Sequence, residues 1–146
     1  MNVSRLCKRQ VVTVTPQQEL VFAAELMREK HIGFLIVVEE YGRPIGVLTD
    51  RDIVVSVVAK RADPSLLKVA DVMTRDPTTA DEGESVANAL RTMRRIGVRR
   101  LPVVGSKGLL TGILALDDVL DVLANELAEV SGAIRNEQHI EGVLRS

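Results

Sequence analysis

Residues 46–52, with the sequence GVLTDRD, carry the side chains best suited to hold a ligand. Apolar residues before Thr49 predict a strand, and Asp52 follows in the expected first turn of a helix. A helix N-terminus offers unpaired N–H groups and partial positive charge, which suit a phosphate, and the Thr49 hydroxyl adds a donor. A carboxylate repels phosphate, but Asp52 can accept hydrogen bonds from two neighbouring ribose hydroxyls. Gly46 would permit a close backbone approach.

The same motif has a purely structural interpretation. T-x-x-D is also a capping box, in which Thr49 caps the helix and Asp52 reaches back to the strand end. This interpretation needs no ligand. The two are compatible, because an empty site can cap itself.

The chain contains the same pattern twice, at an offset of 66 positions, so that Gly46 falls on Gly112 and Asp52 on Asp118. Likewise, MREKHIGFLIVV at 27–38 falls on MRRIGVRRLPVV at 93–104. An internal repeat indicates two similar structural units and brings two versions of any site together. The versions differ, because Ala115 replaces Thr49 while the aspartate persists as Asp118.

Each copy predicts the order strand, helix, strand, strand, helix, an α/β fold. In the first copy, strands are expected at 11–14, 34–38 and 45–49, and helices at 17–31 and 50–59. The β-branched run IVVSVV at 53–58 has strand propensity. The aligned stretch DDVLDVLANEL has a helical pattern, so both are predicted to be helices.

The repeat places the copies at residues 3–59 and 69–127, with a linker at 60–68 and a helical extension at 128–146. The helical pattern after Asp117 runs to about residue 136. Its apolar stripe consists of Leu120, Leu123, Leu127, Val130 and Ile134. Such a face needs a cover, either the rest of the chain or a second subunit.

Bulk composition excludes several classes of protein. The net charge is −1, so there is no overall attraction to nucleic acid or acidic lipid. No apolar run approaches the roughly 20 residues that span a bilayer, and the first ten residues do not look like a signal peptide. A single cysteine, Cys7, fits a reducing compartment. We therefore expect a cytoplasmic protein.

These features together resemble a tandem CBS (cystathionine β-synthase) domain pair, or Bateman module. The resemblance rests on paired β-α-β-β-α units, the opening VADVMTRDP, the strand LPVV and the junction GVLTDRD. It implies two repeats packed as a pseudo-twofold pair, commonly dimeric, with clefts that bind adenosine ligands such as AMP, ADP, ATP, NAD-type dinucleotides or S-adenosylmethionine. It also implies regulation of an effector protein, here as a stand-alone chain.

The resemblance assigns Thr49 to phosphate and Asp52 to ribose. It places adenine beside the first strand, near Val12 and Thr13, with Val47 as a further wall. AMP is the first choice of ligand, and neither a required cofactor nor a metal is expected.

The pair should also bring the second copy's strand start to this cleft, where Arg99 and Arg100 could bind a phosphate. The opposite cleft would have Gly33 and Phe34 at those positions, with Asp118 but neither the hydroxyl nor the cations. We therefore predict one competent nucleotide site and one degraded or differently selective site. A solvated strand end or a salt bridge would equally explain the two arginines.

Other functions remain as alternatives. No nucleotide-loop, nucleophile-elbow or zinc-protease motif is present, so an enzyme is not expected. The arginine-rich stretch RTMRRIGVRR at 91–100 could meet nucleic acid, but a solvated helix face explains it more simply. Phe22 and Leu26 form a second apolar stripe, which would suit a dimer or partner interface in a ligand-free interaction module. We predict a homodimer that binds an adenine nucleotide and signals to an unidentified effector, with no membrane contact.

Overall fold

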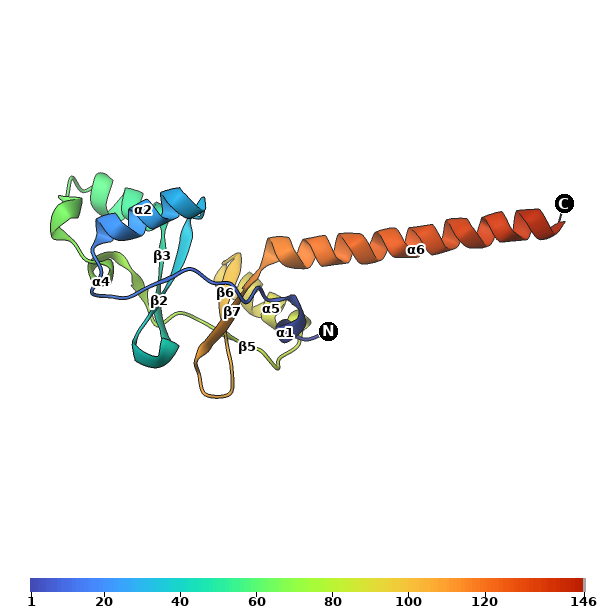
Figure 1. Ribbon diagram of the computed structural model, residues 1–146, viewed down its shortest axis with the longest axis horizontal. Helices are drawn as coiled ribbons and strands as arrows, with labels where there is room; N and C mark the ends of the chain where they lie inside the picture. Colours follow the sequence, from blue (N-terminus) through green and yellow to red (C-terminus); the bar gives the residue numbers. More distant parts are fainter. Residues whose placement is uncertain (146) are drawn as a thin grey trace.

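The computed structural model describes residues 1–145 and contains two small sheets, one built mainly from each copy of the repeat (Figure 1). The first sheet has the order β1-β2-β3-β4 and the second β5-β6-β7. In both sheets the first strand runs parallel to the second, and the next pairing is antiparallel. The predicted α/β fold is confirmed.

The first copy has the predicted order of elements. Its strands are β1 (Thr13–Val14), β2 (Phe34–Val38) and β3 (Pro44–Thr49), and its helices are α2 (Leu20–Lys30) and α3 (Asp50–Ile53), the latter continued by a π-helical turn, Val54–Val58. The β-branched run at 53–58 is therefore helical, as the repeat indicated. Both β1 and α2 are shorter than predicted, because the chain before each of them is irregular.

The second copy repeats these elements as β5 (Ala80–Asp81), α5 (Val86–Ile96), β6 (Arg100–Val104), β7 (Leu110–Ala115) and α6 (Leu116–Arg145). Helix α6 runs through the predicted helical extension to Arg145, beyond the end of the regular apolar pattern near residue 136. Ser146, the last residue of the predicted extension, lies outside the described residues. The predicted linker contains a short 3₁₀ turn, Pro64–Leu66, capped by Asp63.

The opening segments of the two copies, residues 2–8 and 68–75, are exchanged. Helix α1 (Val3–Leu6) lies on the second copy, where the Val3 amide donates to the Glu84 carbonyl. Helix α4 (Val69–Val72) lies on the first copy, where the Val69 amide donates to the Gln18 carbonyl. Strand β4 (Thr74–Arg75) accordingly joins the first sheet beside β3. The exchange is reciprocal, so the copies form a single interlocked pair.

Two glycines accommodate this exchange. A Cβ at Gly46 would lie 2.9 Å from the Thr74 carbonyl oxygen, and a Cβ at Gly112 would lie 2.7 Å from the Lys8 carbonyl oxygen. Gly46 therefore permits a close approach by the second copy's opening segment.

The two hydrophobic cores confirm the interlocked arrangement. In the first core, Leu20, Leu35 and Leu48 pack with Val69 and Met73 from the opening segment of the second copy. In the second core, Met93, Leu101 and Leu114 pack with Val3 from the first. Each copy therefore needs the other to complete its core, as expected for units of this size.

Candidate functional site

Two cavities lie between the copies, and both are lined by the exchanged segments. The Thr49 cavity has a volume of about 590 Å³, and the Asp118 cavity one of about 360 Å³. Their linings are related by the repeat offset: Thr74, Asp76, Pro77 and Thr78 in the first correspond to Lys8, Gln10, Val11 and Val12 in the second. Both volumes fall in the range of small-molecule sites.

At the Thr49 cavity, the strand-to-helix junction forms the capping box. The Thr49 hydroxyl oxygen accepts from the Asp52 amide at 3.1 Å, and Asp52 Oδ2 accepts from the Thr49 amide at 2.9 Å. The structural interpretation of T-x-x-D is thus confirmed. Among residues 1–145, however, no hydrogen bond involves Asp52 Oδ1 or uses the Thr49 hydroxyl as a donor. The cap leaves one acceptor and one donor available. The N–H groups of the first turn, which were expected to be unpaired, are instead paired, because the Asp50 amide donates to the Gly33 carbonyl at 3.0 Å and the Arg51 amide to Asp50 Oδ1 at 2.8 Å.

Two arginines from the start of β6 line the same cavity. Arg99 forms an ion pair with Asp117 at 2.8 Å, but both side chains are about two-thirds exposed, so this pair adds little stability. The Arg100 guanidinium lies over the Phe34 ring, 5.9 Å from its centroid. Both cations are therefore held loosely enough to turn toward an anion.

The structure brings together four of the predicted site residues, namely Val47, Thr49, Arg99 and Arg100. Asp52 does not line the cavity, because its carboxylate is turned back to cap the helix. Val12 lines the opposite cavity and Thr13 neither of the two. The exchange explains this: the first copy's chain before β1 leads to the Asp118 cavity, and Pro77 and Thr78 occupy the equivalent place beside Thr49.

The sequence did not reveal that residues between Thr74 and Thr78 line the Thr49 cavity. The repeat held the relevant information, because residues 77 and 78 align with 11 and 12. It could not say which copy's opening segment faces which cavity.

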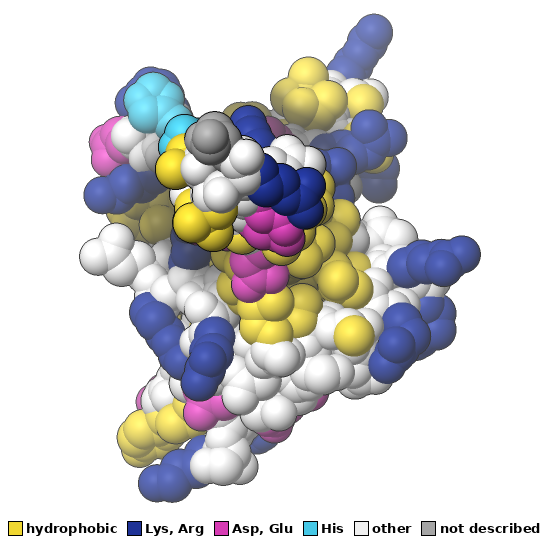
Figure 2. Space-filling model, turned by 90° about the vertical axis from the view of Figure 1, so that its right-hand side faces the viewer, with side chains coloured by type: hydrophobic (Ala, Val, Ile, Leu, Met, Phe, Trp, Pro, Cys, Tyr) yellow, Lys and Arg dark blue, Asp and Glu magenta, His cyan; other side chains and the backbone are white. Residues whose placement is uncertain are grey.

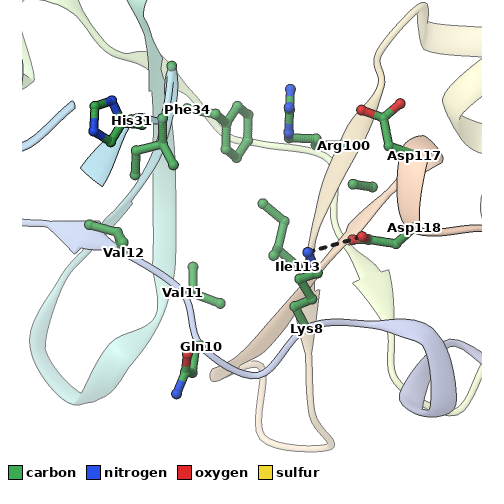
Figure 3. A pocket seen from close by; sticks show the side chains of 13 residues that line it. Lys8, Gln10, Val11, Val12, His31, Phe34, Arg100, Ile113, Asp117 and Asp118 are labelled. Atoms are coloured by element: carbon green, nitrogen blue, oxygen red, sulfur yellow. Dashed lines mark ion pairs between the residues drawn. The ribbon is translucent and has the colours of Figure 1, made fainter. Parts of the chain in front are cut away.

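The Asp118 cavity is chemically different (Figure 3). Ala115 replaces the threonine, and Asp118 forms an ion pair with Lys8 at 3.2 Å. His31 lines this cavity and adopts a left-handed backbone conformation, with φ 54°, where the second copy has Gly97. The prediction that this cleft lacks cations is wrong, since Lys8 and Arg100 line it.

The two cavities share a wall. Gly33, Phe34 and Arg100 line both, and Phe34 and Arg100 are equivalent positions of the repeat. Figure 3 shows the two side chains next to each other between the sheets. One arginine therefore lies within reach of a ligand in either cavity.

Other site classes find no support within residues 1–145. No group of three or more His, Cys, Asp or Glu side chains there could hold a metal ion. None of the described helices is long and apolar enough to cross a membrane.

Two interlocked β-α-β-β-α units with paired clefts define a class of tandem α/β repeats. Comparison with known sequences identifies the family: residues 3–59 and 69–125 each match the CBS domain, and the chain belongs to this family.

Similar proteins include the CBS domain-containing protein YhcV of Bacillus subtilis, 36% identical over 131 residues, which are 89% of this chain and 90% of YhcV. The uncharacterized protein MK0525 of Methanopyrus kandleri is 36% identical over 122 residues, 84% of this chain but only 62% of that protein. Among solved structures, the cytosolic domain of the Mg²⁺ channel MgtE in complex with ATP is similar, with a TM-score of 0.72 and 30% identity over 83% of this chain and 48% of the other.

Proposed function

We propose that this protein is a sensor that binds an adenine nucleotide in the Thr49 cavity and reports its occupancy to an effector protein. AMP is the first candidate, followed by ADP and ATP. One observation carries the proposal: a free hydroxyl donor, a helix N-terminus and three arginines, Arg51, Arg99 and Arg100, meet at a single cavity. No chemical step is part of it.

The phosphate end of the ligand would lie at the start of the helix that begins at Asp50. There it would meet the Thr49 hydroxyl and the helix dipole. Arg99 and Arg100 would supply charge-assisted hydrogen bonds. Arg51, Asp50 and Asp76 also line the cavity, so its lining carries three arginines against two aspartates. A ligand with few phosphates fits this balance better than a polyanion.

The nucleoside end would occupy the apolar part of the cavity. Val47 and Pro77 offer flat apolar walls, and Thr78 offers a polar side chain. The ribose would turn toward Asp52, which lies outside the cavity lining, so its carboxylate would have to rotate for Oδ1 to accept from a hydroxyl. The ATP complex of the MgtE cytosolic domain supports an adenine nucleotide over other anions.

Occupancy would be transmitted through the contact between copies. A phosphate that attracts Arg100 would draw it away from Phe34, which lies on the first copy. Any ligand that binds one arrangement of the copies more tightly shifts the population toward it. The working unit in this proposal is a homodimer that samples the cytoplasmic nucleotide pool.

Calorimetric titration tests the proposal directly. AMP, ADP, ATP, NAD and S-adenosylmethionine would be titrated into the wild type and into Thr49→Val, which keeps the side-chain shape but removes the hydroxyl. We expect saturable binding of an adenine nucleotide near one equivalent per chain, weakened in the variant. An absence of heat with all five ligands would refute the proposal and favour an interaction module. Binding of an unrelated oligonucleotide that falls steeply with salt would instead support the arginine-rich face as a nucleic-acid surface.

A further inference from the structure

Helix α6 carries an uncovered apolar stripe, formed by Leu120, Leu123, Leu127, Val130 and Ile134. Their spacing alternates between three and four residues, as in the core positions of a coiled coil. Each of these side chains is between 48% and 71% exposed. An apolar face of this regularity is unusual on a solvated helix.

The rest of the chain does not cover this stripe. Val119 is buried against the second core and fixes the base of the helix. Beyond it, α6 projects away from the two sheets (Figure 1). Figure 2 looks onto the C-terminal end of this helix and shows hydrophobic side chains left open beside it. Of the two covers that the sequence allows, the chain itself and a second subunit, the first is therefore excluded for residues 120–134.

We propose that two copies of this chain associate through α6 as a parallel, in-register, two-stranded coiled coil over residues 120–134. In this arrangement each stripe residue meets its own counterpart, giving five apolar layers with no polar residue among them. The second sheet also favours this association, because it anchors the first turn of α6. The Leu116 amide donates to the Arg99 carbonyl at 2.9 Å. The cost of helix nucleation is thereby met before the partner binds.

Charge favours the parallel orientation. Glu126 is the one ionised residue directly flanking the stripe between Leu120 and Ile134. In a parallel pair it lies beside Ser131 of the partner subunit, which is neutral. An antiparallel pair that matches Leu123 with Leu127 would bring Glu126 against Glu126 of the partner subunit. Shifting this antiparallel pair by one heptad would place Leu120 opposite Glu137 of the partner subunit, so that a carboxylate faces an apolar layer.

The same pattern sets where the coil ends. After Ile134, the next two core positions are Glu137 and Glu141. Two pairs of buried carboxylates would oppose further pairing. The final turns of α6 would therefore separate. Because the two helices are parallel, the sheets of both subunits would lie at the same end of the coil. The inference specifies the surface for the proposed homodimer and is independent of nucleotide binding.

Molar mass in solution tests the proposal without a ligand. Light scattering coupled to size-exclusion chromatography should give twice the 16.0 kDa of the chain for the wild type. Leu127→Glu should reduce this to a single chain, because it places a charge in the central layer. Leu127 is 71% exposed, so the two sheets should keep their melting temperature. Asn125→Glu adds the same charge on the opposite side of α6 and should remain dimeric. A monomeric or trimeric wild type, or a dimer unaffected by Leu127→Glu, would overturn the proposal.

A cysteine variant tests the orientation. With Cys7→Ser in place, Ile134→Cys should form an interchain disulfide under mild oxidation, because a parallel pair brings residue 134 next to residue 134 of the partner subunit. In the antiparallel pair, residue 134 would instead lie opposite residue 116. A dimer that does not cross-link through residue 134 would overturn the parallel register.

Discussion

The variant Asp52→Asn separates the cap from the ligand site. In the structure, Asp52 Oδ2 accepts from the Thr49 amide while Oδ1 has no partner among the described residues. An asparagine keeps one carbonyl oxygen, which can still accept from the Thr49 amide. Its NH₂ group replaces Oδ1 and cannot accept from a ribose hydroxyl.

The two roles differ in the size of the expected effect. Losing the negative charge in the first turn of the helix should lower the free energy of unfolding by only about 0.5 kcal/mol. Losing a hydrogen bond to a charged acceptor should weaken nucleotide binding by about 2 kcal/mol, roughly 30-fold in Kd. Asp52→Ala also removes the hydrogen bond from the Thr49 amide, while the Thr49 hydroxyl still accepts from the amide of residue 52, and should lower the unfolding free energy by about 1 kcal/mol more.

Denaturant unfolding would measure the first quantity and calorimetry the second. Asp118→Asn is the matched control, because Asp118 is the equivalent residue of the other cavity and pairs with Lys8. It should leave binding in the Thr49 cavity unchanged. The reasoning fails if Asp52→Asn binds nucleotide as tightly as the wild type, or if Asp118→Asn loses it instead.

Three further substitutions test the frame around the site. Gly46→Ala should lower the free energy of unfolding by about 1–3 kcal/mol, because its Cβ would meet a backbone oxygen at 2.9 Å. The control is Gly105→Ala, where the nearest neighbour of the new Cβ is a methyl group at 3.3 Å. This variant should lower the free energy of unfolding much less in the same denaturant titration. His31→Gly should raise the melting temperature, since relief of its left-handed backbone contributes roughly 0.5–1 kcal/mol; an unchanged or lower value would mean that the imidazole makes a stabilising contact. Arg100→Met should weaken nucleotide binding about tenfold in calorimetry while changing stability by less than about 1 kcal/mol; unchanged affinity would exclude Arg100 from the site.

The repeat made most of the architecture predictable. The helical form of residues 53–58 contradicts their β-branched composition, and only the aligned second copy indicated it. The capping box was predictable for a related reason, because its two hydrogen bonds depend only on neighbouring residues. Arg99 and Arg100 could be assigned to the cavity because the resemblance implied that the copies face each other.

The exchange of opening segments could not be predicted in the same way. Residues 2–8 and 68–75 have similar apolar patterns, so either could complete either core. The hydrophobic pattern is satisfied equally in both arrangements, and the choice depends on the path of the chain between the copies. This choice moved Val12 away from Thr49 and brought Lys8 to Asp118. The regular apolar pattern of α6 ends near residue 136 although the helix continues to Arg145, because its last two turns lack that spacing.

A crystal structure grown with the tightest-binding adenine nucleotide tests the central claim most directly. We expect the ligand in the Thr49 cavity, with a phosphate oxygen within hydrogen-bond distance of the Thr49 hydroxyl, and with Arg100 moved from the Phe34 ring toward that phosphate. A nucleotide found only in the Asp118 cavity, or on the outer surface of the molecule, would contradict the account.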